Sequence, residues 1–173
     1  MGQQPQVRLR RYRSDMEFKG LPLHPLVVHA TVVFVPLAAL AAILYAAPRW
    51  RWLLRWPTLL VNLAAAVLVQ VAWMSGHSLE TSLEKTRGLQ PSIVSNHVLW
   101  AGRLRIGMFV LVVVVVVAFW ALGYVTRLVG GTDRAARMGA LELPLMVLLP
   151  VAAVAVLVLV FLTGDAGARA VWG

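Results

Sequence analysis

The chain has 173 residues, of which 60% are hydrophobic and only 13% are charged, with a net charge of +9 and no cysteine. A mean hydropathy of +0.79 excludes an ordinary soluble domain, which needs far more polar surface at this length. The lack of cysteine excludes disulfides, iron–sulfur clusters, thioether-linked haem and thiol catalysis in this chain. The arginines lie beside apolar runs, so their expected partner is the anionic surface of a lipid bilayer and not nucleic acid.

The chain opens with a polar, basic tail, residues 1–20. Arg8, Arg10, Arg11 and Arg13 lie close together in it, and few apolar residues accompany them. Such a segment cannot bury enough apolar surface to fold alone, so we expect it to be disordered or to lie on lipid headgroups. The folded domain is expected to cover residues 21–173.

Four apolar runs are long enough to cross a bilayer, which takes about 20 helical residues. They cover residues 26–47, 57–76, 104–125 and 141–163. Strands of a membrane barrel are about half as long and alternate in polarity, so they do not explain these runs. The sequence therefore predicts an all-α polytopic membrane protein, with four transmembrane helices arranged as two helical hairpins.

The segments between the runs predict two kinds of link. Residues 48–56 alternate arginine with tryptophan, a composition typical of a link at the headgroup interface. In the link between the second and third runs, Thr81 and Glu84 have the spacing of a helix-capping box. We therefore expect a short separate helix that ends at Gly88, and a third helix that restarts near Ser92.

All four histidines are expected on one side of the membrane. Each lies near an end of an apolar run, and because successive spans alternate in direction, these ends meet on the same side. The four are His24, His29, His77 and His97. Asp165, Arg103 and Arg105 are expected on the same side. The two predicted hairpins repeat a pattern: His29 and His97 open the first and third helices, and Ser75-Gly76 and Thr163-Gly164 close the second and fourth.

A histidine cluster of this kind predicts a cofactor site. A b-type haem needs one or two neutral imidazoles as axial ligands, usually from facing helices of a bundle. His29 and His97 are the expected axial pair, since they hold equivalent places in the two hairpins. Arg103 and Arg105 follow His97 and are candidates for binding the haem propionates.

Two other interpretations stay open. A zinc, iron or copper ion is the alternative ligand, held by imidazoles such as His24 and His77 with Asp165 or Glu80 as a carboxylate. The other alternative is a structural or assembly subunit of a larger membrane complex, in which the histidines only cap helices and meet headgroups. His24 and His77 are expected in supporting roles in either case.

Several functions are not expected. A proton or ion pathway needs ionisable groups near the middle of the membrane, and the four runs carry none there. A chain of haems across the membrane needs histidines on both sides. No motif for hydrolysis or group transfer occurs, so we do not expect an enzyme.

The segment Leu21-Pro22-Leu23-His24-Pro25-Leu26-Val27-Val28-His29 resembles the opening motif, HP-x-x-VH, of the family named domain of unknown function 2231. Gly76 at the end of the second run, His97 before the third and the glycine-rich end of the fourth extend the resemblance over residues 21–173. The chain departs from the family pattern at His77, where an acidic residue is common, and at Asp165, where histidine is common.

The resemblance implies a four-helix bacterial membrane protein whose relatives occur joined to Rieske-type or cytochrome-type redox domains. It thereby implies a redox protein or a larger membrane complex as a partner. It also implies the inner (plasma) membrane as the location. Ten of the 16 Lys and Arg residues lie on the side of the N-terminus, so the positive-inside rule predicts a cytoplasmic N-terminus.

Overall fold

The computed structural model describes residues 17–18, 21–87, 91–122 and 132–172, with side chains at 26–76, 96–122 and 140–169. Four long helices dominate it: α1 (Leu23–Ala46), α2 (Arg51–Arg87), α3 (Pro91–Leu122) and α4 (Thr132–Trp172). A one-turn 3-10 helix, η1 (Pro48–Trp50), joins α1 to α2. Four helical segments, Leu26–Ala46, Pro48–Gly76, Asn96–Leu122 and Ala140–Arg169, are long and apolar enough to cross a membrane. The predicted all-α fold with four membrane helices is confirmed.

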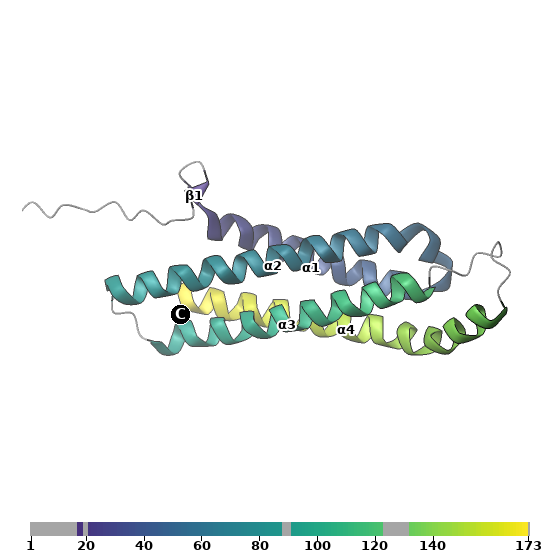
Figure 1. Ribbon diagram of the computed structural model, residues 1–173. Coiled ribbons are helices and arrows are strands. Elements are labelled where there is room, and N and C mark those ends of the chain that lie inside the picture. Colours follow the sequence, from purple (N-terminus) through teal and green to yellow (C-terminus); the bar gives the residue numbers. More distant parts are fainter. Residues whose placement is uncertain (1–16, 19–20, 88–90, 123–131, 173) are drawn as a thin grey trace, which may run out of the picture.

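The helices run side by side and form a ring in which each contacts two neighbours (Figure 1). The extensive contacts are α1 with α2, α2 with α3, α3 with α4, and α4 with α1, so α1 and α3 lie diagonally across the bundle. Four residues before and at the entry to α1 form a small antiparallel ladder, β1 (Glu17–Phe18) with β2 (Leu21–Pro22). This ladder includes two residues of the predicted tail; residues 1–16 and 19–20 lie outside the described residues.

The predicted links were wrong in two places. Arg51 to Trp56 belong to α2, because the 3-10 turn that starts at Pro48 continues directly into that helix. Proline lacks a backbone N–H, which costs nothing at a helix start because that N–H would have no partner there. The predicted break before Thr81 does not occur either, since α2 continues to Arg87. The expected restart of the third helix is confirmed: α3 begins at Pro91, which places His97 in its second turn.

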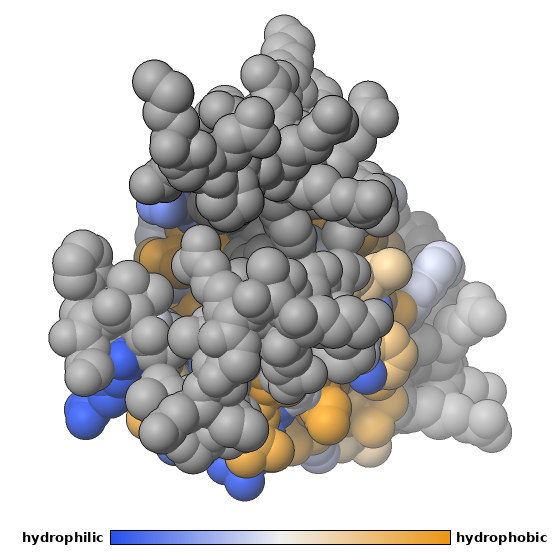
Figure 2. Space-filling model, turned by 90° about the vertical axis from the view of Figure 1, so that its left-hand side faces the viewer, coloured by the Kyte–Doolittle hydropathy of each residue, from blue (hydrophilic) through white to orange (hydrophobic). Residues whose placement is uncertain are grey.

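The outer surface of the bundle is largely apolar. Large side chains are exposed along all four helices, among them Val33, Leu60, Phe109 and Phe161. Figure 2 views the end of the bundle next to β1, where hydrophilic patches adjoin apolar ones around the described surface. An apolar belt with polar groups at an end is the surface that a bilayer requires.

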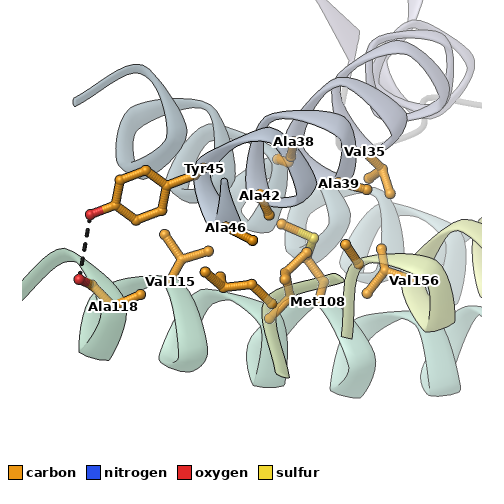
Figure 3. Close-up of a cluster of buried hydrophobic side chains, with 14 of the residues drawn as sticks. Val35, Ala38, Ala39, Ala42, Tyr45, Ala46, Met108, Val115, Ala118 and Val156 are labelled. Carbon is orange, nitrogen blue, oxygen red and sulfur yellow. Dashed lines mark hydrogen bonds between the residues drawn. The ribbon is translucent and has the colours of Figure 1, made fainter. Parts of the chain in front are cut away.

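The core depends on small side chains on one face of α1. Val35, Ala38, Ala39, Ala42 and Ala46 recur at helical spacing and are buried. In Figure 3 this face lies against Met108 and Val115 of α3 and Val156 of α4. Alanine keeps the helix backbones close, and close packing holds membrane helices together where lipid removes the hydrophobic driving force.

Polar side chains of α2 use this closeness. The Thr58 hydroxyl donates to the Ala41 carbonyl at 3.3 Å, and the Asn62 amide donates to the Ala38 carbonyl at 3.2 Å. Asn62 also donates to its own helix, at the Thr58 carbonyl. Both residues are fully buried. The two bonds between helices hold α1 and α2 in their antiparallel register.

Removing a buried side chain from this core should destabilise the bundle more than removing one that faces lipid. Met108 is 1% exposed and Ile106, on the same helix, is 64% exposed. We expect Met108→Ala to lower the free energy of unfolding by roughly 2–3 kcal/mol, because the side chain leaves a cavity. Ile106→Ala should change it by less than about 0.5 kcal/mol, since lipid fills the space. Steric-trap unfolding in bicelles measures both; equal losses would contradict this core.

Candidate functional site

The start of α1, the end of α2, the start of α3 and the end of α4 lie at one end of the bundle (Figure 1). The backbones of all four histidines belong to these segments, so the expectation that one end carries every histidine is confirmed. His24 lies in the first turn of α1, directly before Pro25. The side chains of His24, His77 and Glu80 lie outside the described residues. We call this part of the bundle the histidine end.

His97 makes the best-defined polar contact at the histidine end. Its Nδ1 lies 3.1 Å from the backbone carbonyl oxygen of Thr163 on α4. A carbonyl oxygen only accepts hydrogen bonds, so Nδ1 carries the proton and donates. In the neutral imidazole, Nε2 then keeps its lone pair. The contact therefore fixes both the orientation of the ring and the nitrogen that is able to bind a ligand.

A glycine makes room for the ring. A Cβ atom at Gly167 would lie 3.1 Å from both Nδ1 and Cε1 of His97, closer than such contacts normally are. Because Gly167 has no side chain, the imidazole reaches the carbonyl one turn earlier on α4. The glycine-rich end of the fourth helix thus has a packing role at this site.

The two arginines that follow His97 both lie against tryptophan rings. The Arg105 guanidinium is 4.1 Å from the ring centre of Trp73 on α2, and that of Arg103 is 4.5 Å from the ring centre of Trp100. Arg103 is exposed and Arg105 is half-buried. A guanidinium that stacks on a ring keeps its N–H groups in the plane available to an anion. Trp73 and Trp100 were not among the expected site residues.

An axial pair would require His29 and His97 to face one another, and His29 does not lie in the interior of the bundle. It lies on the exposed surface of α1, and α2 and α4 separate α1 from α3 around the ring. His97 is half-buried between α3 and α4. The two residues share one end of the bundle, and pairing of their imidazoles on one ligand stays a prediction.

Comparison with known proteins adds the family. Residues 20–173 match the family described as a predicted membrane protein, DUF2231. The chain belongs to this family. The search of curated proteins and the search of solved structures each found no match. The resemblance seen in the opening motif is therefore confirmed over the whole helical domain.

Asp165 forms an ion pair with a residue of its own helix. Its Oδ2 accepts from Nε of Arg169 at 2.9 Å, one turn further along α4. Among the described residues, no three His, Cys, Asp or Glu side chains come close enough to hold a metal ion. A metal site with His24, His77 and Asp165 would need side chains outside that part of the chain.

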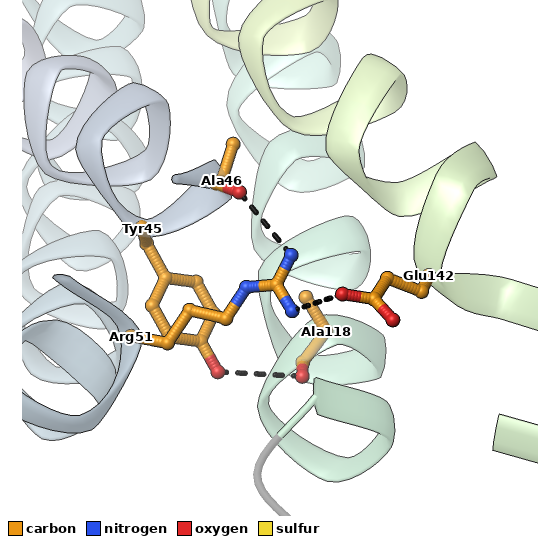
Figure 4. A network of polar contacts seen from close by, with 5 residues as sticks. All are labelled: Tyr45, Ala46, Arg51, Ala118 and Glu142. Atoms are coloured by element: carbon orange, nitrogen blue, oxygen red, sulfur yellow. Dashed lines mark hydrogen bonds and ion pairs between the residues drawn. The ribbon is translucent and has the colours of Figure 1, made fainter. Parts of the chain in front are cut away.

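The opposite end of the bundle holds a polar network that the sequence did not lead us to expect (Figure 4). Nη1 of Arg51 lies 2.6 Å from Oε1 of Glu142 on α4, and Nη2 donates to the carbonyl of Ala46 at 3.3 Å. The Tyr45 hydroxyl reaches across the diagonal and donates to the Ala118 carbonyl of α3 at 3.4 Å. The sequence did hold a signal for this network: Glu142 is a lone carboxylate at the start of the fourth apolar run, on the same side as the arginine-rich link at residues 48–56.

The contact between His97 and Gly167 yields a test with a matched control. Gly167→Ala should displace the imidazole by a few tenths of an ångström and weaken its bond to Thr163, because the new methyl group would otherwise overlap the ring. Gly164→Ala, one turn earlier, should leave it in place, since nothing lies within 4 Å of that Cβ position. Nitrogen-15 NMR shifts of the imidazole report the difference. Unchanged shifts in Gly167→Ala would show that the ring lies elsewhere.

Proposed function

We propose that this chain is a non-catalytic membrane protein that serves as a redox-accessory subunit, and that it binds a b-type haem at the histidine end. The observation that carries the proposal is the hydrogen bond from Nδ1 of His97 to the Thr163 carbonyl. Metal-binding histidines characteristically donate their second ring nitrogen to a carbonyl or carboxylate, which fixes the tautomer and makes the other nitrogen a better ligand.

The chemistry of the donor set fits such a group. His97 offers Nε2 with its lone pair, and neutral imidazole is the usual axial ligand of b-type haem. Arg103 and Arg105 lie on the same helix as His97, so each is a candidate to bind a propionate. His29 is the candidate for a second axial ligand. When bound, the haem would supply one-electron transfer, and the chain orients the imidazole through the bond to the Thr163 carbonyl.

The interior of the bundle supports an accessory role over transport. Apart from Tyr45 at the opposite end, the buried polar side chains of the described residues are Thr31, Thr58, Asn62 and Ser75, none of which titrates. All four donate to helix carbonyls. A proton pathway needs ionisable groups at this depth. A ligand site at one end suits exchange of electrons with a partner on that side of the membrane.

We further propose the bacterial inner membrane as the location, with the N-terminus in the cytoplasm. The family supports a membrane location, and the excess of Lys and Arg on the side of the N-terminus supports this orientation. The histidine end would then face the cytoplasm.

The absorption spectrum of protein purified from haem-supplemented cells tests the haem proposal. We expect a Soret band that His97→Ala abolishes, because this substitution removes the oriented nitrogen. Asn96→Ala is the matched control, an exposed neighbour on the same helix turn, and should leave the band intact. His29→Ala should convert a six-coordinate spectrum to a five-coordinate one if His29 is the second ligand.

Colourless protein from such cells would overturn the haem proposal, and elemental analysis would then separate the two alternatives. Bound zinc, iron or copper in the colourless protein would favour a membrane metalloprotein. Protein that is both colourless and free of metal would favour a structural or assembly subunit. A Soret band that survives His97→Ala would exclude His97 as the ligand.

A further inference from the structure

Asn62 places a polar side chain at the middle of the membrane. It lies halfway along the α2 span, Pro48–Gly76, and its side chain is fully buried in the bundle. Neither lipid headgroups nor bulk water reach this depth, and a polar group without a hydrogen bond is costly there. Each polar atom of Asn62 therefore has to be satisfied from inside the bundle.

The amide nitrogen of Asn62 is satisfied, and this fixes the orientation of the side chain. Nδ2 donates to the Ala38 carbonyl of α1 at 3.2 Å and to the Thr58 carbonyl of α2 at 2.9 Å. An amide nitrogen has two N–H donors, so both are used. Turning the amide over would bring Oδ1 against two carbonyl oxygens, neither of which can donate a hydrogen bond to it.

The side-chain oxygen of Asn62 has no such partner. Oδ1 is shielded from solvent, and among the described residues no donor lies within hydrogen-bond distance of it. Leaving a buried carbonyl oxygen without a hydrogen bond costs its full desolvation, and nearly all such oxygens in folded proteins have a partner in the protein or in a bound water. A small molecule that donates a hydrogen bond to Oδ1 would remove this cost.

The residues around Asn62 restrict what such a molecule can be. On α2, Thr58 lies one turn before Asn62 and Ala65 about one turn after it. On α1, Ala38 accepts from Asn62, and Ala42 follows one turn later. These side chains are short, fully buried and not ionisable. A bare cation needs several oxygen ligands and a counter-charge, so the molecule has to be small and uncharged.

The Thr58 hydroxyl offers a second contact. It donates its proton to the Ala41 carbonyl at 3.3 Å, and its oxygen keeps lone pairs that can accept. Residues four apart lie on the same face of a helix, so Oγ1 of Thr58 and Oδ1 of Asn62 are neighbouring acceptors on α2. Two acceptors match the two O–H donors of a water molecule, and a buried water needs at least two polar partners.

We propose that the bundle holds an internal water molecule at mid-membrane, which donates one hydrogen bond to Oδ1 of Asn62 and the other to Oγ1 of Thr58. The water completes the polar contact between α1 and α2, because these two residues are the ones that donate to the α1 carbonyls. Since the bundle encloses it, this water exchanges slowly with bulk water. The site is separate from His97 and does not depend on the haem proposal.

Asparagine labelled with carbon-13 at Cγ tests this proposal, because the chain contains only two asparagines, Asn62 and Asn96. In the perdeuterated full chain in lipid bilayers, solid-state NMR correlates each Cγ with the protons of nearby water. We expect a water signal at both. A paramagnetic chelate in the aqueous phase should abolish the signal of the exposed Asn96 and leave that of Asn62. No water signal at Asn62, or its loss together with that of Asn96, would overturn the proposal.

A variant separates a bound water from the Thr58 hydroxyl as the source of the signal. Thr58→Ala removes the hydroxyl, opens space and frees the Ala41 carbonyl, so a water can stay on Oδ1 and the signal at Asn62 should persist. Loss of the signal in a folded Thr58→Ala chain would show that the hydroxyl is the donor and would overturn the proposal. The proton shift of the source in the wild-type chain gives the same distinction if this variant does not fold.

Discussion

The close approach of α1 to its neighbours is the constraint on which the rest of this structure depends. A bilayer gives membrane helices little hydrophobic reason to associate, so backbone proximity and hydrogen bonds between helices must hold them together. Ala38, Ala39, Ala42 and Ala46 form a face without bulk on α1. Because no large side chain covers the carbonyls of Ala38 and Ala41, α2 reaches them with Asn62 and Thr58. Larger residues on this face would separate the helices and leave those polar groups unsatisfied in the core.

The same constraint gives the two ends different roles. At the end of α1, the Arg51–Glu142 ion pair joins α2 to α4 and the Tyr45 hydroxyl joins α1 to α3, so these polar groups serve the fold. Glu142 is 41% exposed, which lowers the cost of bringing charge to this depth. At the histidine end, a hydrogen bond from α3 to α4 orients an imidazole and uses one of its two nitrogens.

Hydropathy predicted the four helices because a bilayer demands long apolar runs, yet it did not predict where they end. Polar residues continue α2 to Arg87, and the spacing of Thr81 and Glu84 suggested a helix start that continuous helical hydrogen bonding overrides. The position of His97 was predictable from the alternation of the spans. Its bond to Thr163 was not, since a backbone carbonyl leaves no mark in the sequence and the packing of α3 on α4 decides which one lies near. The pairing of Arg51 with Glu142 likewise depends on α4 being a neighbour of α1.

The close packing of α1 on α2 is tested most directly by disulfide cross-linking, for which a chain without cysteine is well suited. Ala41→Cys paired with Thr58→Cys should cross-link rapidly on mild oxidation in membranes, because the Thr58 hydroxyl lies 3.3 Å from the Ala41 carbonyl. Leu40→Cys paired with Thr58→Cys should not, since Leu40 faces outward. Rapid cross-linking of the Leu40 pair, or none in the Ala41 pair, would contradict this arrangement of the helices.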